Sequence, residues 1–385
     1  MNEEFSTAYG LTRELVRIDS SDPGAYEGKI CGFVKGWLEE RGLAVMVSEV
    51  LPGRSNLLCR IPGESSGPSL TYICHMDTVA LGDGWSRDPL GAEVSDGRIY
   101  GRGACDMKSG LACAMSAFAA IAESGKKPKH TFQLIATVDE EDFMRGVEQA
   151  IRDNWVTSSD WVLDTEPTNG QIQVAHKGRT WFEVSIQGVT AHASTPWKGA
   201  DAIAAMAEVI TRIRSQVNGL PPHPDLGVST VTFGQIEGGY RPYVVPDSCR
   251  VWIDMRLVPP TDTSAAEAIV AGALRAACRE VPGCQGSYRI TGDRPYVEKD
   301  ENSHLLHALS ETCRHVLGEA PVVSYFPGYT DTAVIAGTLS NRNCMSYGPG
   351  DLELAHKPDE SVPINDIIRC EKVLKALAEQ MIFED

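Results

Sequence analysis

The feature that most constrains the fold is the order in which strand-like and helix-like segments follow one another. In the first part of the chain, short apolar runs such as residues 69–74 and 131–138 alternate with helical patterns such as residues 5–21 and 111–122. Strands that alternate with helices favour a mostly parallel sheet with helices on both faces. We therefore predict an α/β fold for this part.

A different order begins near residue 180. Segments predicted as strand, helix, strand, strand, helix and strand lie at residues 180–187, 200–215, 228–236, 249–257, 264–280 and 286–290. This β-α-β-β-α-β order is typical of a ferredoxin-like α+β unit. The chain then returns to alternating helices and strands. We therefore predict one domain from residues 1–179 and 292–385, with a second domain, residues 180–291, inserted into it.

Length and composition agree with two folded domains. A chain of 385 residues exceeds what one hydrophobic core usually supports. Its 42% hydrophobic and 23% charged residues are ordinary for globular proteins and exclude a disordered or collagenous chain. The net charge of −17 at pH 7 repels polyanions, so we expect neither nucleic acid nor a membrane as a partner.

Three further features indicate the compartment. Residues 1–12 lack the basic and apolar segments of a secretion signal, and no apolar run reaches the roughly 18 residues of a membrane span. The eleven cysteines include no C-x-x-C pair. We therefore expect a cytoplasmic protein with reduced thiols, most of which are buried.

Acidic and imidazole side chains follow three of the predicted strands, at the end of each strand. They are His75 and Asp77, the run Asp139-Glu140-Glu141-Asp142, and Asp164 and Glu166. Because open parallel sheets bind ligands outside the carboxyl ends of their strands, we expect these side chains to share one crevice. Carboxylates gathered in a crevice repel one another, and a divalent metal with oxygen and nitrogen ligands removes that repulsion.

Two of these groups have spacings that indicate separate roles. In extended chain, residues two apart point to one side, so Asp77 could orient His75 as a metal ligand. The alternative is a surface turn with an incidental acid. The side chains of Glu140 and Glu141 diverge, so one could bind metal while the other acts as general base. The alternative there is a solvated acidic loop.

Two loops add further candidates. Residues 101–110 form a glycine-rich loop that enters a helix and carries Asp106. An aspartate would repel a bound phosphate, so the loop favours a metal over a nucleotide, with a structural turn as the remaining alternative. Residues 347–360 form a glycine- and proline-containing loop with one histidine, His356. A lone loop histidine is more often a surface residue than a ligand.

Taken in this order and at these spacings, the motifs resemble those of the M20 family of metallopeptidases and deacylases along nearly the whole chain. The matching segments are Cys74-His75-Met76-Asp77, residues 97–110, Asp139-Glu140-Glu141, Thr165-Glu166-Pro167-Thr168, His176-Lys177-Gly178, residues 188–194, residues 328–331 and residues 356–360.

The resemblance implies a catalytic site with two divalent metal ions, usually zinc, although cobalt or manganese can share such ligands. It implies that Asp106 bridges the ions, that His75 and Glu166 complete one site, and that Glu141 and His356 complete the other. It further implies that Asp77 orients His75, that Glu140 is the general base and that the Asp106–Met107 peptide is cis. Asp164 is an alternative to Glu166, because some relatives use aspartate as the terminal ligand.

The resemblance also implies a role for the inserted domain, as a lid that forms a homodimer. His192 would then reach a partner's active site and stabilise the oxyanion. Arg256 is a candidate fork for a substrate carboxylate, and its alternative is a surface salt bridge. Tyr243 stands where the family often has an asparagine near the substrate, so Tyr243 or Arg241 could take over that contact.

We therefore predict a dinuclear metal-dependent hydrolase that cleaves the amide bond of an N-acyl amino acid, as a deacetylase or desuccinylase does. A metal-bound water would be the nucleophile. A dipeptidase or carboxypeptidase of the same family is the alternative, because it cleaves a chemically equivalent bond. More remote alternatives are a catalytically silent metal-binding protein on this fold and a nucleotide-binding α/β enzyme.

Overall fold

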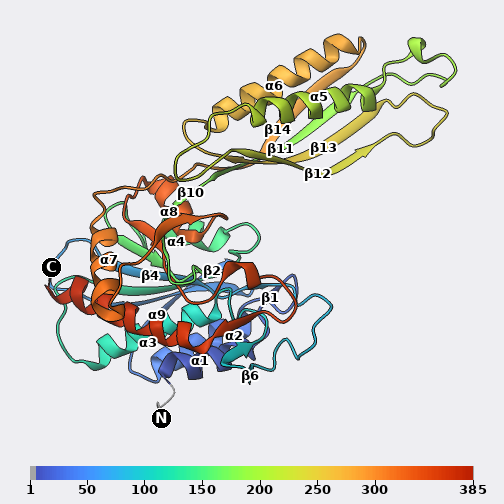
Figure 1. The fold of residues 1–385 in the computed structure, drawn as a ribbon. Helices are drawn as coiled ribbons and strands as arrows, with labels where there is room; N and C mark the ends of the chain where they lie inside the picture. The colour runs from blue at the N-terminus through green and yellow to red at the C-terminus, as the bar shows by residue number, and fades with distance from the viewer. Residues whose placement is uncertain (1–5, 385) are drawn as a thin grey trace. The chain divides into compact units, whose positions relative to one another are not determined.

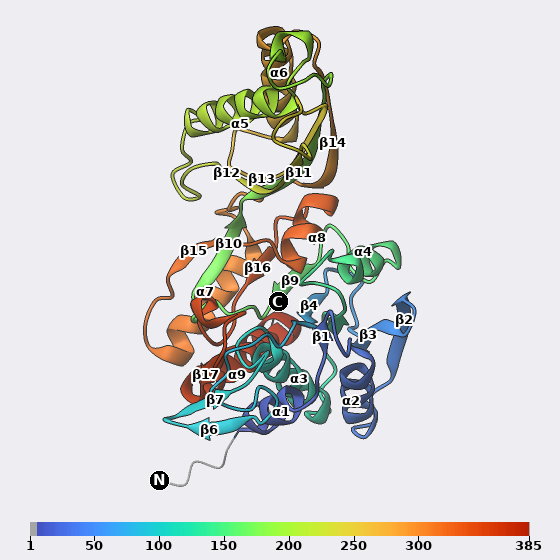
Figure 2. The ribbon, with the colours of Figure 1, turned by 90° about the vertical axis from the view of Figure 1, so that its right-hand side faces the viewer.

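The structure is a computed structural model that describes residues 6–384. The chain divides into two compact units (Figures 1 and 2). The first contains the described residues up to Val174, together with Lys299–Phe326 and the chain from Thr330 onwards. The second contains Ala175–Glu298 and Pro327–Tyr329.

An eight-stranded sheet forms the centre of the first unit, in the order β15-β10-β16-β9-β4-β8-β3-β2. The strands are β2 (Val45–Leu51), β3 (Arg54–Ile61), β4 (Leu70–His75), β8 (Phe132–Thr137), β9 (Trp161–Asp164), β10 (Ile172–His176), β15 (Val323–Phe326) and β16 (Cys344–Ser346). The four central strands β16, β9, β4 and β8 run parallel, and the antiparallel pairs lie towards the edges. The predicted α/β class is therefore confirmed, but the sheet is mixed where a mostly parallel one was predicted.

Helices cover both faces of this sheet (Figure 1). One face carries α1 (Thr7–Val16), α2 (Gly28–Glu39), α3 (Lys108–Glu123) and α9 (Ile364–Glu379), with α7 (His304–Leu317) against α9. The other face carries α4 (Arg145–Arg152) and α8 (Asp331–Leu339). Strands β4 and β8 are buried along their whole length, as expected for central strands with helices on both sides.

The first helix is shorter than its apolar pattern predicts. Residues 5–21 were expected to be helical, but α1 ends at Val16, and residue 5 lies outside the described residues. The side chain of Asp19 accepts hydrogen bonds from the backbone N–H of Ser21 at 3.0 Å and from its hydroxyl at 2.7 Å. This local turn competes with helix, and Pro23 favours extended backbone before it, so the prediction was wrong beyond Val16.

The second unit has the predicted ferredoxin-like order. Its antiparallel sheet has the order β12-β13-β11-β14. The elements are β11 (Gly178–Gln187), α5 (Ala202–Asn218), β12 (Thr230–Gly238), β13 (Ser248–Leu257), α6 (Thr263–Glu280) and β14 (Gln285–Arg294). Alternate residues of β13 are buried, so one face of the sheet packs against α5 and α6 and forms a separate core.

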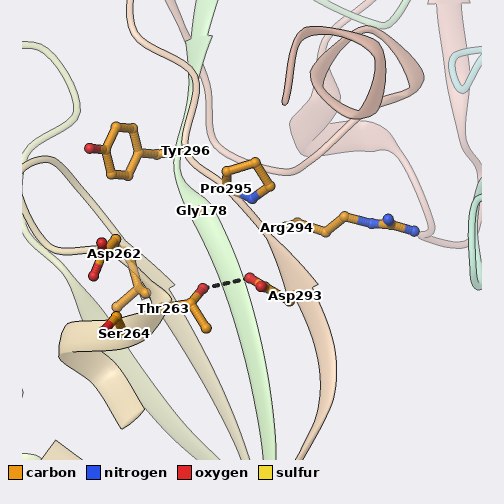
Figure 3. A pocket seen from close by; sticks show the side chains of 9 residues that line it. Gly178, Asp262, Thr263, Ser264, Asp293, Arg294, Pro295 and Tyr296 are labelled. Carbon is orange, nitrogen blue, oxygen red and sulfur yellow. Dashed lines mark hydrogen bonds between the residues drawn. The ribbon is translucent and has the colours of Figure 1, made fainter. Parts of the chain in front are cut away.

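A pocket of about 430 Å³ lies within the second unit, at the start of α6 and the end of β14 (Figure 3). The hydroxyl of Thr263 donates to the carboxylate of Asp293 in its wall. The residues predicted from the sequence to bind metal or substrate do not line this pocket.

Two smaller observations complete the description. Nine of the eleven cysteines are buried, which confirms the expectation that most of them are core residues. Among residues 6–384, no helix has both the length and the apolar character needed to cross a membrane.

Candidate metal centre

Three neighbouring strands of the first sheet bring the predicted site residues to one edge. Strand β4 lies between β9 and β8, and all three are parallel. Their carboxyl ends therefore point the same way. His75 is the last residue of β4, Glu140 and Glu141 follow β8, and Glu166 follows β9.

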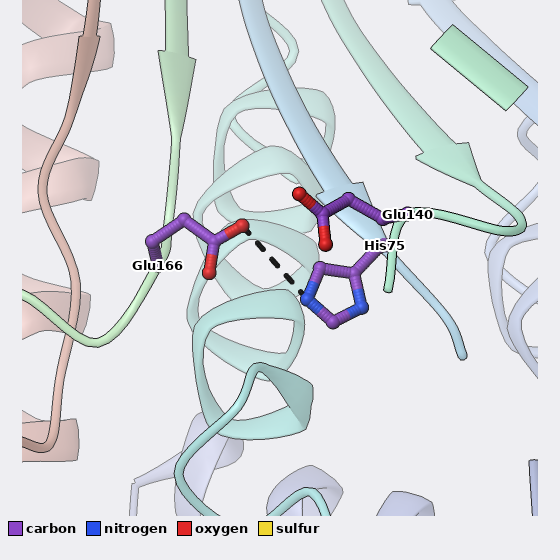
Figure 4. A group of neighbouring side chains, drawn as sticks. All are labelled: His75, Glu140 and Glu166. Carbon is purple, nitrogen blue, oxygen red and sulfur yellow. Dashed lines mark ion pairs between the residues drawn. The ribbon is translucent and has the colours of Figure 1, made fainter. Parts of the chain in front are cut away.

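His75 is oriented by a backbone carbonyl, with its second ring nitrogen towards the neighbouring carboxylates. Its Nδ1 lies 2.9 Å from the backbone carbonyl oxygen of Asp77. A carbonyl can only accept, so Nδ1 carries a proton and Nε2 is the ring nitrogen that faces the carboxylates. This Nε2 lies 3.2 Å from Oδ1 of Asp106 and 3.8 Å from Oε1 of Glu166. Figure 4 shows the carboxylates of Glu166 and Glu140 turned towards the imidazole.

Asp106 divides its two carboxylate oxygens between two histidines. Oδ1 faces Nε2 of His75 at 3.2 Å, and Oδ2 faces Nε2 of His356 at 3.3 Å. Burial alone would raise the pKa of Asp106, but its hydrogen bonds to His356 and His75 lower that pKa below its usual range. An aspartate in this position has one oxygen available on each side, as a bridging ligand requires.

Glu141 completes the group on the side of His356. The imidazole Nε2 of His356 lies 3.0 Å from Oε2 of Glu141 and 3.2 Å from its Oε1. His356 has a backbone φ of 63°, a left-handed conformation that is uncommon outside glycine and occurs often at functional sites. Its side chain is half-exposed, but its Nε2 faces the carboxylates.

Glu140 is buried beside these ligands (Figure 4). Burial raises the pKa of its carboxyl group well above the usual value. His75 opposes this rise, whereas the negative charges of Asp331 and Glu141 add to it. A carboxylate with a raised pKa is a stronger base than one in water, which suits a group that must accept and return a proton.

Asp77 lies at the expected place, but the orienting atom differs from the predicted one. The spacing predicted a contact between His75 and the Asp77 carboxylate, whose Oδ1 lies 3.7 Å from Nδ1. The short contact comes from the backbone carbonyl instead. The carboxylate Oδ2 accepts the backbone N–H of Glu141 at 3.0 Å. Burial raises the pKa of Asp77 to about 7.

Asp164, the alternative ligand, is engaged elsewhere. Its buried carboxylate accepts a hydrogen bond at 2.7 Å from the hydroxyl of Thr332, in α8. Glu166 is the residue that the structure places beside His75.

The glycine-rich loop fits closely against the end of β9. A Cβ atom at Gly110 would lie 2.1 Å from the backbone oxygen of Thr165, a distance that no side-chain-bearing residue can accommodate without movement. This close approach brings the start of α3 against the segment that carries Glu166. The Asp106–Met107 peptide is cis, as the family resemblance implied.

Glu360 supports the loop that carries Asp106, a role that its motif in the sequence did not predict. Its Oε1 accepts the backbone N–H groups of Cys105 at 2.9 Å and Asp106 at 3.0 Å. Its Oε2 accepts from Arg102 at 2.6 Å. Glu360 therefore holds the loop that presents Asp106. The sequence offered one indication of this role: Glu360 lies four residues after His356, in the same motif.

The donor set fits divalent metal ions. Four carboxylates and two imidazoles converge in a largely buried group, and ligand atoms of His75, Asp106 and Glu141 lie within 4.8 Å of one another. Unpaired burial of so many carboxylates is costly, and oxygen with imidazole nitrogen is a ligand set that zinc, cobalt and manganese accept. The group Asp22, Asp139 and Asp142 differs, because arginines already neutralise it.

The predicted substrate residues belong to the second unit. His192 is exposed, and its Nδ1 accepts the backbone N–H of Ser194 at 3.2 Å. Its Nε2 therefore carries the proton and can donate. Tyr243 and Arg241 are also exposed.

Arg256 forms the salt bridge that the sequence left open as an alternative. Its Nε and Nη2 lie 2.8 and 3.0 Å from the two carboxylate oxygens of Asp254. The guanidinium of Arg256 is therefore already paired with a carboxylate of the same strand, β13.

Comparisons with known proteins agree with this site. An acetylornithine deacetylase from Vibrio cholerae is 27% identical to this chain over 374 residues. The alignment covers 95% of each chain. Two solved structures share the fold. A tripeptidase from Staphylococcus aureus has a TM-score of 0.80 at 22% identity, with 97% of this chain and 98% of that chain covered. A dinuclear metal-binding peptidase from Bacillus subtilis has a TM-score of 0.72 at 18% identity, with 97% of each chain covered.

The family assignment rests on a match that covers most of the chain. Residues 72–380 match the family described as Peptidase family M20/M25/M40. Members of this family are metal-dependent hydrolases that act on amides, and the matched segment contains every residue of the metal cluster described above. The chain belongs to peptidase family M20/M25/M40 and is a metal-dependent hydrolase of amide bonds.

Proposed function

We propose that this protein is a dinuclear metallohydrolase that cleaves the amide bond of an N-acyl amino acid. The observation that carries the proposal is the division of the Asp106 carboxylate between His75 and His356, with the buried Glu140 beside them. The likeness to an acetylornithine deacetylase over 95% of the chain supports an acylated amino acid as substrate.

We assign the metal ligands by their positions in this group. His75 and Glu166 would hold one ion, Glu141 and His356 a second, and Asp106 would join them. Zinc is the ion that we expect, because two imidazoles and several carboxylates suit it. When bound, the ions supply Lewis acidity to the attacking water and to the amide carbonyl.

The proton transfers fall to Glu140. Its carboxylate would accept a proton from the attacking water and pass it to the leaving amine, for which its raised pKa is suited. Asp77 fixes the imidazole of His75 through its carbonyl and the peptide of Glu141 through its carboxylate.

The second unit would supply the remaining contacts. The Nε2–H of His192 is a donor for the oxyanion. Arg241 and Tyr243 are exposed groups available to a substrate. Arg256 would reach a substrate carboxylate only by giving up Asp254. We further propose that residues 180–291 act as a lid and form a homodimer in a cytoplasmic enzyme, and light scattering of the purified protein tests the dimer.

A hydrolysis screen followed by mass spectrometry tests the proposed function. Zinc- or cobalt-loaded enzyme and a chelated control are given N-acetyl and N-succinyl amino acids and dipeptides. Metal-dependent release from acylated amino acids alone is expected. Release from dipeptides alone would instead identify a peptidase of the same family. Silence across the panel, with two metals bound per chain, would refute the substrate class.

A further inference from the structure

The turn that carries Glu140 and Glu141 is held by a buried network of charged side chains outside the metal cluster. The turn begins at Asp139, whose backbone φ is 66°. This left-handed conformation is uncommon for a residue with a side chain and persists where surrounding contacts hold it.

Glu27, directly before α2, contacts this turn through the backbone. Its Oε1 accepts the N–H of Asp139 at 3.0 Å. The guanidinium of Arg54 donates to both oxygens of Glu27, from Nε at 2.6 Å and from Nη2 at 2.5 Å. All three residues are buried. Because the planar fork matches a carboxylate, Arg54 fixes both the position and the rotation of Glu27.

The other charges of the network are paired as well. Arg54 lies 2.7 Å from a carboxylate oxygen of Asp22 and 3.4 Å from one of Asp139. Arg145 donates to both oxygens of Asp139 at 2.6 Å. Removal of the Glu27 carboxylate therefore leaves Arg54 with two acidic partners, and no buried charge is stranded.

The chain is anchored on both sides of Glu140. The backbone N–H of Asp139 donates to Glu27, and the backbone N–H of Glu141 donates to Asp77 at 3.0 Å. Glu140 thus extends from a short stretch of backbone that two separate buried carboxylates hold. Its direction towards His75 depends on both anchors.

We propose that Glu27 is a positioning residue for the general base, with Arg54 holding it in place. Glu27 acts through the Asp139 peptide and touches no reacting atom. This inference rests on the proposed role of Glu140 in the proposed function. Glu27 would thus affect catalysis although it lies 113 positions before Glu140 in the chain.

Steady-state kinetics of Glu27→Ala, on any substrate that the wild-type enzyme hydrolyses, test the proposal. We expect kcat to fall by about 10- to 100-fold, the size of effect that a small displacement of a catalytic group produces. The KM should change less than about threefold and the metal content should stay at the wild-type value, because Glu27 contacts neither substrate nor the metal ligands' side chains. Glu27→Gln keeps an oxygen for the Asp139 N–H and should recover about tenfold of the lost kcat.

Two comparisons separate positioning from a general structural effect. Glu39 also lies on α2, and Glu39→Ala removes only its exposed ion pair with Lys35. The kcat of this variant should therefore equal that of the wild type. In a Glu140→Gln background, Glu27→Ala should cost no further activity, because the residue through which it acts is already disabled.

Several results would overturn the proposal. One is a wild-type kcat in folded Glu27→Ala. Another is a loss of kcat that Glu27→Gln does not recover, and a third is a loss of kcat in proportion to a loss of bound metal. A wild-type rate for Glu140→Gln alone would overturn the base assignment, and this role of Glu27 with it. If Glu27→Ala does not fold, Arg54→Lys, which keeps the charge but loses the fork, should lower kcat about tenfold, and an unchanged kcat would overturn the proposal.

Discussion

At the scale of single residues, the chemistry of the site depends on which atom of each side chain faces which neighbour. His75 turns its Nδ1 to a carbonyl and so presents its Nε2 to the carboxylates. His192 turns its Nδ1 to a backbone N–H and so presents a protonated Nε2. The neighbouring backbone therefore decides which ring nitrogen each histidine presents.

Glu140→Gln should abolish most turnover without removing the metals. The amide keeps the size of the side chain but cannot accept the proton of water, so we expect kcat to fall by about 10²- to 10⁴-fold. Metal content, measured by mass spectrometry of the purified protein, should equal that of the wild type. Glu141→Gln is the matched comparison and should bind less metal. Near-normal turnover of Glu140→Gln would exclude it as the base.

His176 should make stability depend on pH. Burial lowers its pKa to about 4, whereas the unfolded chain has the ordinary value of about 6.5. The unfolded state then binds more protons between these values, so this contribution is complete above pH 6.5 and is lost as pH falls towards 4. The loss amounts to roughly 3 kcal/mol, from about 1.4 kcal/mol per pKa unit.

Urea unfolding at several pH values measures this contribution. His176→Gln removes the titrating group, so its free energy of unfolding should decline less steeply than that of the wild type between pH 6.5 and 4. Other groups titrate in the same pH range, but their contributions cancel when the variant is compared with the wild type. His315→Gln, at an exposed position of α7, should keep the wild-type slope. Equal slopes for all three proteins would rule out the assignment.

At the scale of elements, the site depends on how closely α3 approaches the end of β9. Gly110 allows this approach because a Cβ there would meet the backbone oxygen of Thr165. Backbone cannot move aside as a flexible side chain can. The helix and the Glu166 segment are therefore held at a spacing that only glycine permits.

Gly110→Ala should destabilise the protein by more than about 1–3 kcal/mol, the usual cost of overpacking, because the clash at 2.1 Å is with backbone. Gly32→Ala is the matched control, since Gly32 lies within α2 and a Cβ there has no neighbour within 4 Å. That change should stabilise the protein by about 0.5–1 kcal/mol through helix propensity. Thermal unfolding of both variants measures the two changes in Tm. Changes of the same sign would contradict the role of Gly110.

At the scale of the whole molecule, the buried carboxylates couple metal binding to stability. Burial raises the pKa values of Glu140 and Glu166 well above normal, and the neighbouring acids add to the rise. An ion that binds only the folded state stabilises it by mass action. The proposed metal ligands would therefore serve the fold as well as the reaction.

Chelated protein should gain stability when zinc is restored. At a free zinc concentration 100 times the dissociation constant, the gain is about 2.7 kcal/mol per site, which is roughly 5–10 °C in Tm for a domain of this size. Asp106→Asn should remove most of the shift, because both proposed sites share Asp106. The same shift in that variant would place the bound zinc outside the proposed centre. Differential scanning fluorimetry is sufficient for this comparison.

The sequence determined the fold class and the types of residue at the site, because both are carried by local patterns. Periodicity predicted the β-α-β-β-α-β block and the alternation around it, since each strand or helix shows its buried face in its own residues. The positions of His75, Glu140 and Glu166 directly after strands indicated a common edge, because the strands are parallel. The end of α1 was missed, since the side chain of Asp19 stops the helix and apolar spacing does not record it.

Only the tertiary structure decided which groups meet. The backbone carbonyl of Asp77 faces His75, Asp254 occupies the fork of Arg256, and Glu360 binds the peptide of Asp106 across 254 positions of sequence. Glu27, with no motif to mark it, reaches the turn of Glu140. The contacts of Glu360 and Glu27 depend on how distant segments pack, and every hydrogen bond forms or fails within a few tenths of an ångström. Local pattern specifies the elements and their chemistry, whereas packing assigns each polar atom its partner.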